Sequence, residues 1–186
     1  MPIACLDPGH GGSDPGACGN GLRECDINLI VALKVKGYLE AVGYQVIMTR
    51  ETDKDVYGPY ATASQELGAR CDISNNAGAD LFVSIHCDSF NEISNGTTTL
   101  YCEGSVKGKQ LAGFIQHQLI SLGGLTDRGL KTNPLYVTKN TDAPACLTEL
   151  AFISNPKDAA KLGDSVWQDQ FARAIARGIT DYFAKN

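Results

Sequence analysis

Ile3-Ala4-Cys5-Leu6, followed directly by Asp7-Pro8-Gly9-His10-Gly11-Gly12, sets the architecture of this chain. The apolar run predicts a short buried strand, and the glycines that continue as far as Gly21 predict a long loop after it. The period of the apolar residues changes once this loop ends. The strand and its loop are therefore the first unit of a longer alternation.

Helical and strand patterns then alternate along the chain. The spacing of three and four predicts a helix with the apolar stripe Ile27, Val31, Val35, Tyr38 and Val42. Asp26 can cap the start of this helix, and Gly43 can end it in a left-handed turn. Strands are expected at 44–49 and 81–86, with a helix at 63–77 between them. This order predicts an α/β fold with parallel crossovers.

The second half of the chain continues the pattern. We expect a strand near a sheet edge at 97–101, a helix at 108–122, an apolar strand at 145–153 and a final helix at 166–183. Ser165 and Gln168 can form a capping box for the last helix, and its predicted core stripe is Trp167, Phe171, Ile175, Ile179 and Tyr182. Segments 54–58 and 126–133 are expected to be surface loops. No repeat or linker divides the 186 residues, so we predict a single domain over 1–186.

Charge and hydropathy exclude several classes of protein. A net charge of -5 and the lack of a basic stripe argue against nucleic-acid binding. No apolar stretch is long enough to insert into a membrane. The first residues lack the charged segment and apolar core of a signal peptide. The chain is therefore expected to be made in the cytosol and released, or to be a trimmed piece of a secreted protein.

Seven cysteines are present, an odd number without a Cys-x-x-Cys pair, which fits neither a complete disulfide set nor a zinc ribbon. Cys5, Cys87, Cys102 and Cys146 lie in apolar runs and are expected to be reduced and buried, since a free thiol behaves as a small hydrophobe. Either Cys18 or Cys25 could join or replace a metal ligand.

Four polar side chains are placed to meet at one rim of the predicted sheet: His10, Glu24, His86 and Glu149. His10 follows the first strand and His86 ends the strand at 81–86, so both lie where ligands bind in open α/β sheets. Glu149 is an isolated carboxylate in an apolar strand, which is costly unless it has a partner or a function. Two imidazoles and one carboxylate can hold zinc with an open position, and a second carboxylate can move a proton. Amide hydrolysis is the leading hypothesis.

Each of these residues also has an ordinary structural explanation. A single histidine is more often hydrogen-bonded than metal-bound, and Glu24 alone could be an exposed loop acid. His117 serves as a control, because it lies off the apolar stripe of its helix and is expected to be exposed. A nucleotide-binding loop at Gly9 is discounted, since the third glycine of the dinucleotide motif is missing and no helix starts there.

Four motifs carry a resemblance to a known family. They are Asp7-Pro8-Gly9-His10-Gly11-Gly12-Ser13-Asp14-Pro15-Gly16-Ala17, Glu24-Cys25-Asp26-Ile27-Asn28-Leu29, Ser84-Ile85-His86, and Leu147-Thr148-Glu149-Leu150-Ala151-Phe152-Ile153-Ser154-Asn155. In this order they resemble the zinc-dependent N-acetylmuramoyl-L-alanine amidases of bacterial autolysins, cell-separation enzymes and phage endolysins. The match spans nearly the whole chain.

The resemblance implies a twisted, mostly parallel sheet of about six strands flanked by helices. It also implies zinc held by His10, Glu24 and His86, with Glu149 catalytic. The substrate would be peptidoglycan, cut between N-acetylmuramic acid and L-alanine by a monomer without a separate wall-binding domain. Two alternatives remain open: another zinc-dependent peptidoglycan hydrolase (a carboxypeptidase or deacetylase), or a non-catalytic wall-binding module.

The chain departs from the family pattern at a few positions. Asp88 stands where the family commonly has asparagine, so it could contact substrate or alter the fit of the stem peptide. Regulated members carry an inserted helix that blocks the site. The stretch from Asp88 to Thr97 is too short for such a helix, which predicts an open groove.

Overall fold

Six strands form one sheet in the order β4-β1-β5-β8-β6-β7. The structure is a computed structural model that describes residues 1–185. The strands are β1 (Ile3–Pro8), β4 (Gln45–Met48), β5 (Leu81–Asp88), β6 (Thr97–Tyr101), β7 (Asp127–Thr132) and β8 (Ala145–Phe152). All neighbouring strands are parallel except β6 and β8. The predicted α/β fold with a mostly parallel sheet of about six strands is confirmed.

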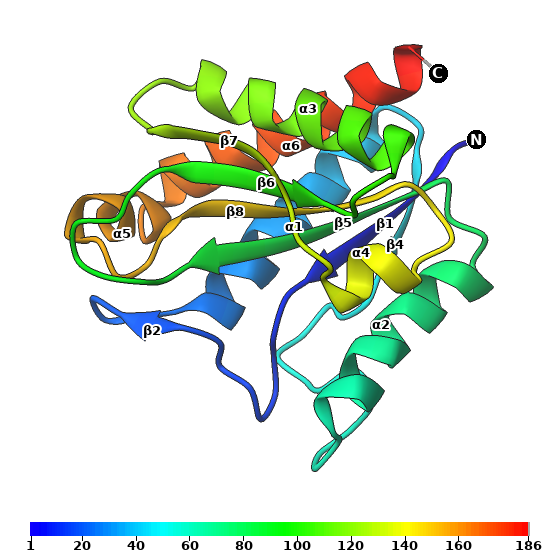
Figure 1. Cartoon of the computed structure of the whole chain (residues 1–186), viewed down its shortest axis with the longest axis horizontal. Helices are drawn as coiled ribbons and strands as arrows, with labels where there is room; N and C mark the ends of the chain where they lie inside the picture. The colour runs from blue at the N-terminus through cyan, green and yellow to red at the C-terminus, as the bar shows by residue number, and fades with distance from the viewer. Residues whose placement is uncertain (186) are drawn as a thin grey trace.

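Helices cover both faces of this sheet (Figure 1). One face packs against α1 (Glu24–Ala41), α3 (Val106–Ser121) and α6 (Ser165–Lys185), and the other against α2 (Ala63–Asn76) and α4 (Tyr136–Asn140). The short helix α5 (Pro156–Leu162) follows β8, and a small hairpin of β2 (Cys18–Gly19) and β3 (Leu22–Arg23) precedes α1. The molecule is thus a three-layer sandwich.

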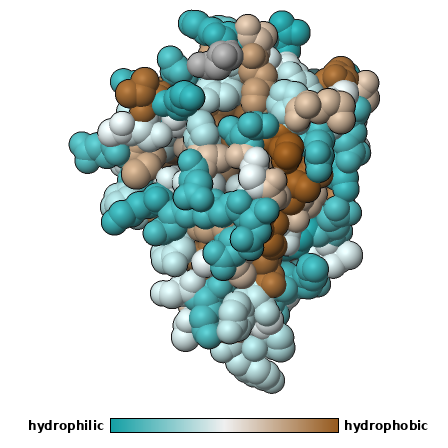
Figure 2. Space-filling model, turned by 90° about the vertical axis from the view of Figure 1, so that its right-hand side faces the viewer, coloured by the Kyte–Doolittle hydropathy of each residue, from teal (hydrophilic) through white to brown (hydrophobic). Residues whose placement is uncertain are grey.

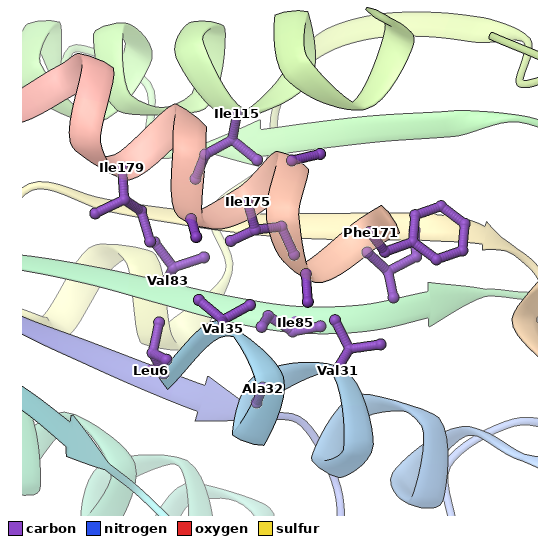
Figure 3. Close-up of a cluster of buried hydrophobic side chains, with 14 of the residues drawn as sticks. Leu6, Val31, Ala32, Val35, Val83, Ile85, Ile115, Phe171, Ile175 and Ile179 are labelled. Atoms are coloured by element: carbon purple, nitrogen blue, oxygen red, sulfur yellow. The ribbon is translucent and has the colours of Figure 1, made fainter. Parts of the chain in front are cut away.

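The larger core lies between the sheet and α1, α3 and α6. Figure 3 shows side chains from the sheet and from these three helices meeting there. The strands contribute Leu6, Val83 and Ile85. The helices contribute Val31 and Val35 from α1, Ile115 from α3, and Phe171, Ile175 and Ile179 from α6. All of these side chains are fully buried. Each such side chain stabilises the fold by roughly 1.5–3 kcal/mol. This core fixes the strands whose ends carry the candidate site.

The ends of α1 differ in how well the sequence predicted them. The helix begins at Glu24, ahead of the expected cap at Asp26, and its N-cap residue Arg23 makes no capping side-chain hydrogen bond. At the other end, Gly43 has φ 88° and donates to Glu40 O, which confirms the left-handed turn. Val42 is exposed, because the residue that continues the buried stripe is Leu39.

Other expectations need correction. Segment 126–133 contains strand β7 rather than only loop. The start of α6 is capped by Asp164, whose carboxylate accepts from the N–H groups of Val166 and Trp167, so Ser165 forms no capping box. Trp167 is only partly buried. The segment 54–58 is a loop, as predicted.

Both chain ends lie at the side of the molecule where β1 begins (Figure 1). Figure 2 shows this side: hydrophilic residues cover most of it, and hydrophobic residues form a narrow band. No helix among residues 1–185 is long and apolar enough to cross a membrane.

Candidate metal centre

The loop after β1 brings His10 back toward the first residue of α1. His10 itself has φ 60°, and Gly16 has φ 66°. A Cβ atom on Gly16 would lie 2.6 Å from Glu24 Oε2 and 2.7 Å from the His10 ring. Only glycine therefore allows the loop to pack this closely beside both side chains.

Three side chains from distant parts of the sequence converge at the carboxyl end of the sheet. Glu24 Oε1 lies 3.2 Å from His10 Nε2 and 2.9 Å from His86 Nδ1. The two imidazole rings meet edge to face, with centroids 4.9 Å apart. Ligand atoms of the three residues all lie within 4.8 Å of one another. The predicted grouping of His10, Glu24 and His86 is present.

Surrounding groups fix the orientation of these side chains. Asp14 Oδ2 lies 2.7 Å from His10 Nδ1, which leaves Nε2 facing Glu24. Glu24 accepts hydrogen bonds from the backbone N–H groups of Ala17 and Cys87 at 2.9 and 3.1 Å. Such outer partners fix ring orientation and tautomer in metal sites. The three residues thus form a group that could hold a metal ion.

Electrostatics match this geometry. Burial opposes protonation of His10, but the hydrogen bonds and negative charges of Glu24 and Asp14 outweigh it and raise the His10 pKa to about 9. Burial likewise opposes ionisation of Glu24, yet the two histidines hold the pKa of this carboxyl far below its ordinary range. Without a metal, a proton on His10 thus supplies positive charge beside the ionised Glu24.

Glu149 lies directly beside His86 in the sheet, since the two residues pair in the β5–β8 register. Its Oε2 atom is buried and has no hydrogen-bond partner among the residues described. Burial, followed by the negative charges of Asp88 and Glu24, raises the Glu149 pKa to about 8. A buried carboxyl group with a raised pKa, next to the cluster of His10, Glu24 and His86, has the properties of a general acid–base.

Asp88 lies two positions beyond His86 and is half-buried. Its Oδ1 accepts a hydrogen bond from Ser89 N at 2.8 Å. Burial above all raises its pKa, while Arg128 and Lys131 lower it. A cavity of 310 Å³ opens on the same side of the sheet; it is lined by His10, His86, Leu67, Tyr136 and Leu147, among others.

Sequence reasoning missed the support beneath His10. The buried guanidinium of Arg70 donates to Asp7 Oδ1 at 2.8 Å and to the carbonyls of Pro8 and His10 at 2.9 Å. The buried Arg50 donates to the Pro8 and Gly9 carbonyls. Asp7 could have been found by the reasoning applied to Glu149, because both are single carboxylates in apolar strands.

The cysteines take no part in the cluster. All seven are free, and neither Cys18 nor Cys25 belongs to the candidate metal-binding group found in the described part of the chain. Cys5, Cys87 and Cys146 are buried as expected, whereas Cys102 is only half-buried. His117 is exposed, which confirms it as the histidine outside the site.

Comparison with known proteins places this geometry in a family. A family model described as N-acetylmuramoyl-L-alanine amidase matches residues 4–181. The chain belongs to this amidase family. The predicted class of enzyme is thereby confirmed, namely an amide hydrolase of peptidoglycan rather than a non-catalytic module.

Individual relatives agree with this amidase assignment. The germination-specific N-acetylmuramoyl-L-alanine amidase of Bacillus subtilis is 36% identical over 98% of this chain and 80% of its own length. The endolysin of Bacillus phage SPP1 is 37% identical over 96% of this chain and 65% of its own length. The CwlD amidase of Clostridioides difficile, solved in complex with the GerS lipoprotein, has a TM-score of 0.94 and 34% identity, with both chains fully covered.

Proposed function

We propose that this amidase is zinc-dependent, with His10, Glu24 and His86 as the metal ligands and Glu149 as the catalytic acid–base. The observation that carries the proposal is the convergence of His10 Nε2 and His86 Nδ1 on one oxygen of Glu24, next to a buried carboxyl oxygen without a partner. Two nitrogens and one carboxylate form a donor set that suits zinc and leaves a position open.

The residues around the ligands keep that donor set in place. Asp14 holds His10 in the tautomer that presents Nε2, and the N–H groups of Ala17 and Cys87 fix both oxygens of Glu24. Gly9 has no side chain at a point where a Cβ atom would lie 2.2 Å from the His86 ring. These contacts restrict the ligands to one geometry before any ion binds.

Bound zinc would supply Lewis-acid polarisation of the scissile carbonyl and lower the pKa of the attacking water. Glu149 accepts the proton of this water and returns it to the nitrogen of the departing L-alanine. Its buried position and raised pKa suit it to hold that proton between the two steps.

The substrate reaches these groups through an open site. Segment 89–96, which follows β5, contains no helix, and Phe90 and Ile93 in this segment are exposed. Asp88 lies where this segment leaves the sheet and contributes to the fit of the stem peptide. The chain acts on the cell wall as a catalytic domain and as a monomer. An endolysin among its relatives supports the action on the wall.

Mass spectrometry of digested, purified cell wall tests the proposal. We expect new alanine amino termini, loss of their release when a chelator removes the metal, and recovery when zinc is returned. Release of acetate would instead indicate a deacetylase, and release of terminal amino acids a carboxypeptidase. Cleavage that continues undiminished in the chelator would contradict zinc dependence.

Metal content provides the matched control. The wild type should bind one equivalent of zinc, and His10→Ala should lose it because one of three protein ligands is gone. His117→Ala removes a histidine that is exposed on α3 and should keep both the zinc and the activity. Equal zinc in the two variants would contradict the ligand assignment.

A further inference from the structure

Two basic side chains lie on the edge strand beside the candidate site without an acidic partner. Arg128 and Lys131 both belong to β7, and neither forms an ion pair within residues 1–185. Both residues are exposed. They are notable in a chain with a net charge of -5, because nearby carboxylates could readily have paired with them.

Arg128 is held in place although it is exposed. Its guanidinium lies over the ring of Phe152, 4.9 Å from the ring centroid, and Nη1 donates to Asn95 O at 3.3 Å. The adjacent acid Asp127 is occupied elsewhere, since it accepts hydrogen bonds from Gln116 Nε2 at 2.7 Å and Gly129 N at 2.8 Å. Arg128 therefore presents a guanidinium that is fixed in place and forms no direct ion pair with a described residue.

The strand register places this charge near the catalytic carboxyl. Glu149 pairs with Thr98 on β6, and Thr97 pairs with Asp127 on β7. Arg128 thus lies about two strand spacings, roughly 10 Å, from Glu149 across the sheet. The positive charges of Arg128 and Lys131 both act to lower the pKa of Asp88, and the charge of Lys131 also acts to lower the pKa of Glu149.

The chemistry of a muramoyl peptide decides which anion can bind here. Its lactyl carboxyl is consumed in the scissile amide, so the remaining carboxylates belong to the stem peptide. The separation of roughly 10 Å between Glu149 and Arg128 is covered partly by the arginine side chain and partly by the peptide, which advances about 3.3 Å per residue when extended. The distance corresponds to a carboxylate on the residue that follows alanine.

We propose that Arg128, assisted by Lys131, binds the free α-carboxylate of the second stem residue and so determines which stem peptides this amidase prefers. The inference rests on the proposed function, because it needs the scissile amide to lie beside Glu149. Binding a carboxylate at this point draws the peptide across β8 and β6 toward the edge strand. A substrate in which this carboxylate is amidated loses the charge-assisted contact.

Paired synthetic muropeptides of equal length test the inference, with isoglutamate or isoglutamine as the second residue. In the wild type we expect kcat/KM to be about tenfold higher for the acid than for the amide. Arg128→Gln should bring this ratio close to one, and Lys131→Gln should lower it less. Lys109→Gln removes the same charge from α3, on the other face of the sheet, and should leave the ratio unchanged.

The outcomes separate this inference from the proposed function. Wild-type release of a peptide with a free alanine amino terminus from either substrate supports the function itself. If Arg128→Gln lowers kcat/KM equally for acid and amide, its role is to position Phe152 or the nearby loop, and the inference is overturned. An Arg128→Lys variant that recovers part of the ratio supports a charge contact, because lysine keeps the charge without the planar fork.

Discussion

Asp7 and Glu149 are both carboxyl groups in central strands of the same sheet, but their surroundings are opposite. Asp7 accepts hydrogen bonds from Arg70, Thr49 and Ser84 at 2.7–2.8 Å and is 1% exposed. Glu149 has a buried oxygen without a partner. The protein satisfies one of these two groups completely and leaves the other unsatisfied.

The pKa values follow this difference. Burial alone would raise the Asp7 pKa, but Arg70 and the two hydroxyl groups lower it overall. Burial and like charges raise the Glu149 pKa. A paired buried carboxylate supports the structure, whereas an unpaired one with a raised pKa suits the proton transfer proposed for Glu149.

The strongest test of this comparison is Glu149→Gln. We expect wall hydrolysis to fall by about 10²- to 10⁴-fold, the usual contribution of a general acid–base, with bound zinc retained. Glu103→Gln is the control, since it removes a similar charge from an exposed loop. Initial rates on purified wall together with zinc analysis measure both effects. A Glu149→Gln protein that cleaves wall at the wild-type rate would refute the catalytic role.

Asp7→Asn should have the next largest effect, this time on stability. Losing the charge leaves the buried Arg70 with Glu66, which is partly exposed, as its remaining anionic partner. The unfolding free energy should fall by at most about 3 kcal/mol, the lower end for breaking a buried ion pair. Glu51→Gln breaks an ion pair of the same 2.8 Å length between Lys36 and Glu51, and should cost less than about 1 kcal/mol because Glu51 is exposed. Urea denaturation at neutral pH compares the two variants.

The loss of stability at acidic pH tests the same contact between Asp7 and Arg70. The Asp7 pKa is lower in the folded state than in the unfolded state, so its contribution is complete above the unfolded value near 4 and is lost as the pH falls further. The wild type should therefore lose stability below about pH 4 more steeply than Asp7→Asn. Parallel curves would show that Asp7 is not the group responsible.

The smallest expected effect concerns Glu149 and the stability of the metal-free protein. The folded-state pKa of Glu149 is about 8, above its unfolded value, so the metal-free protein loses stability as the pH rises from about 4.5 to 8. Glu149→Gln has no such dependence. In chelator, the stability of the variant should therefore rise relative to that of the wild type across this range. Thermal unfolding at pH 5 and pH 8 measures the gain, and none at pH 8 would contradict the buried, unpaired state.

The sequence predicted the fold wherever burial imposes a clear period. The stripe Ile27, Val31 and Val35 and the apolar run at 81–86 identified α1 and β5. Strand β7 was not predicted, because it is an edge strand with mostly exposed residues and Gly129 interrupts its pattern. The five-residue helix α4 is too short to show any periodicity.

The candidate site was predictable to the extent that its residues were unusual for their position. Glu149 was conspicuous as a carboxylate in an apolar strand, and His10 and His86 both follow or end strands. Arg70 was not found, because an arginine on a largely polar helix does not differ in sequence from an exposed one. Its burial results from a long-range contact with Asp7, 63 positions away.

The position of β8 has a consequence for newly made chains. This strand is the last to be synthesised, yet it lies between β5 and β6 and carries Glu149. A nascent polypeptide that ends before about residue 150 lacks the strand between β5 and β6 and the proposed proton acceptor, although it already contains His10, Glu24 and His86. Amidase activity is therefore expected only of a chain that includes β8.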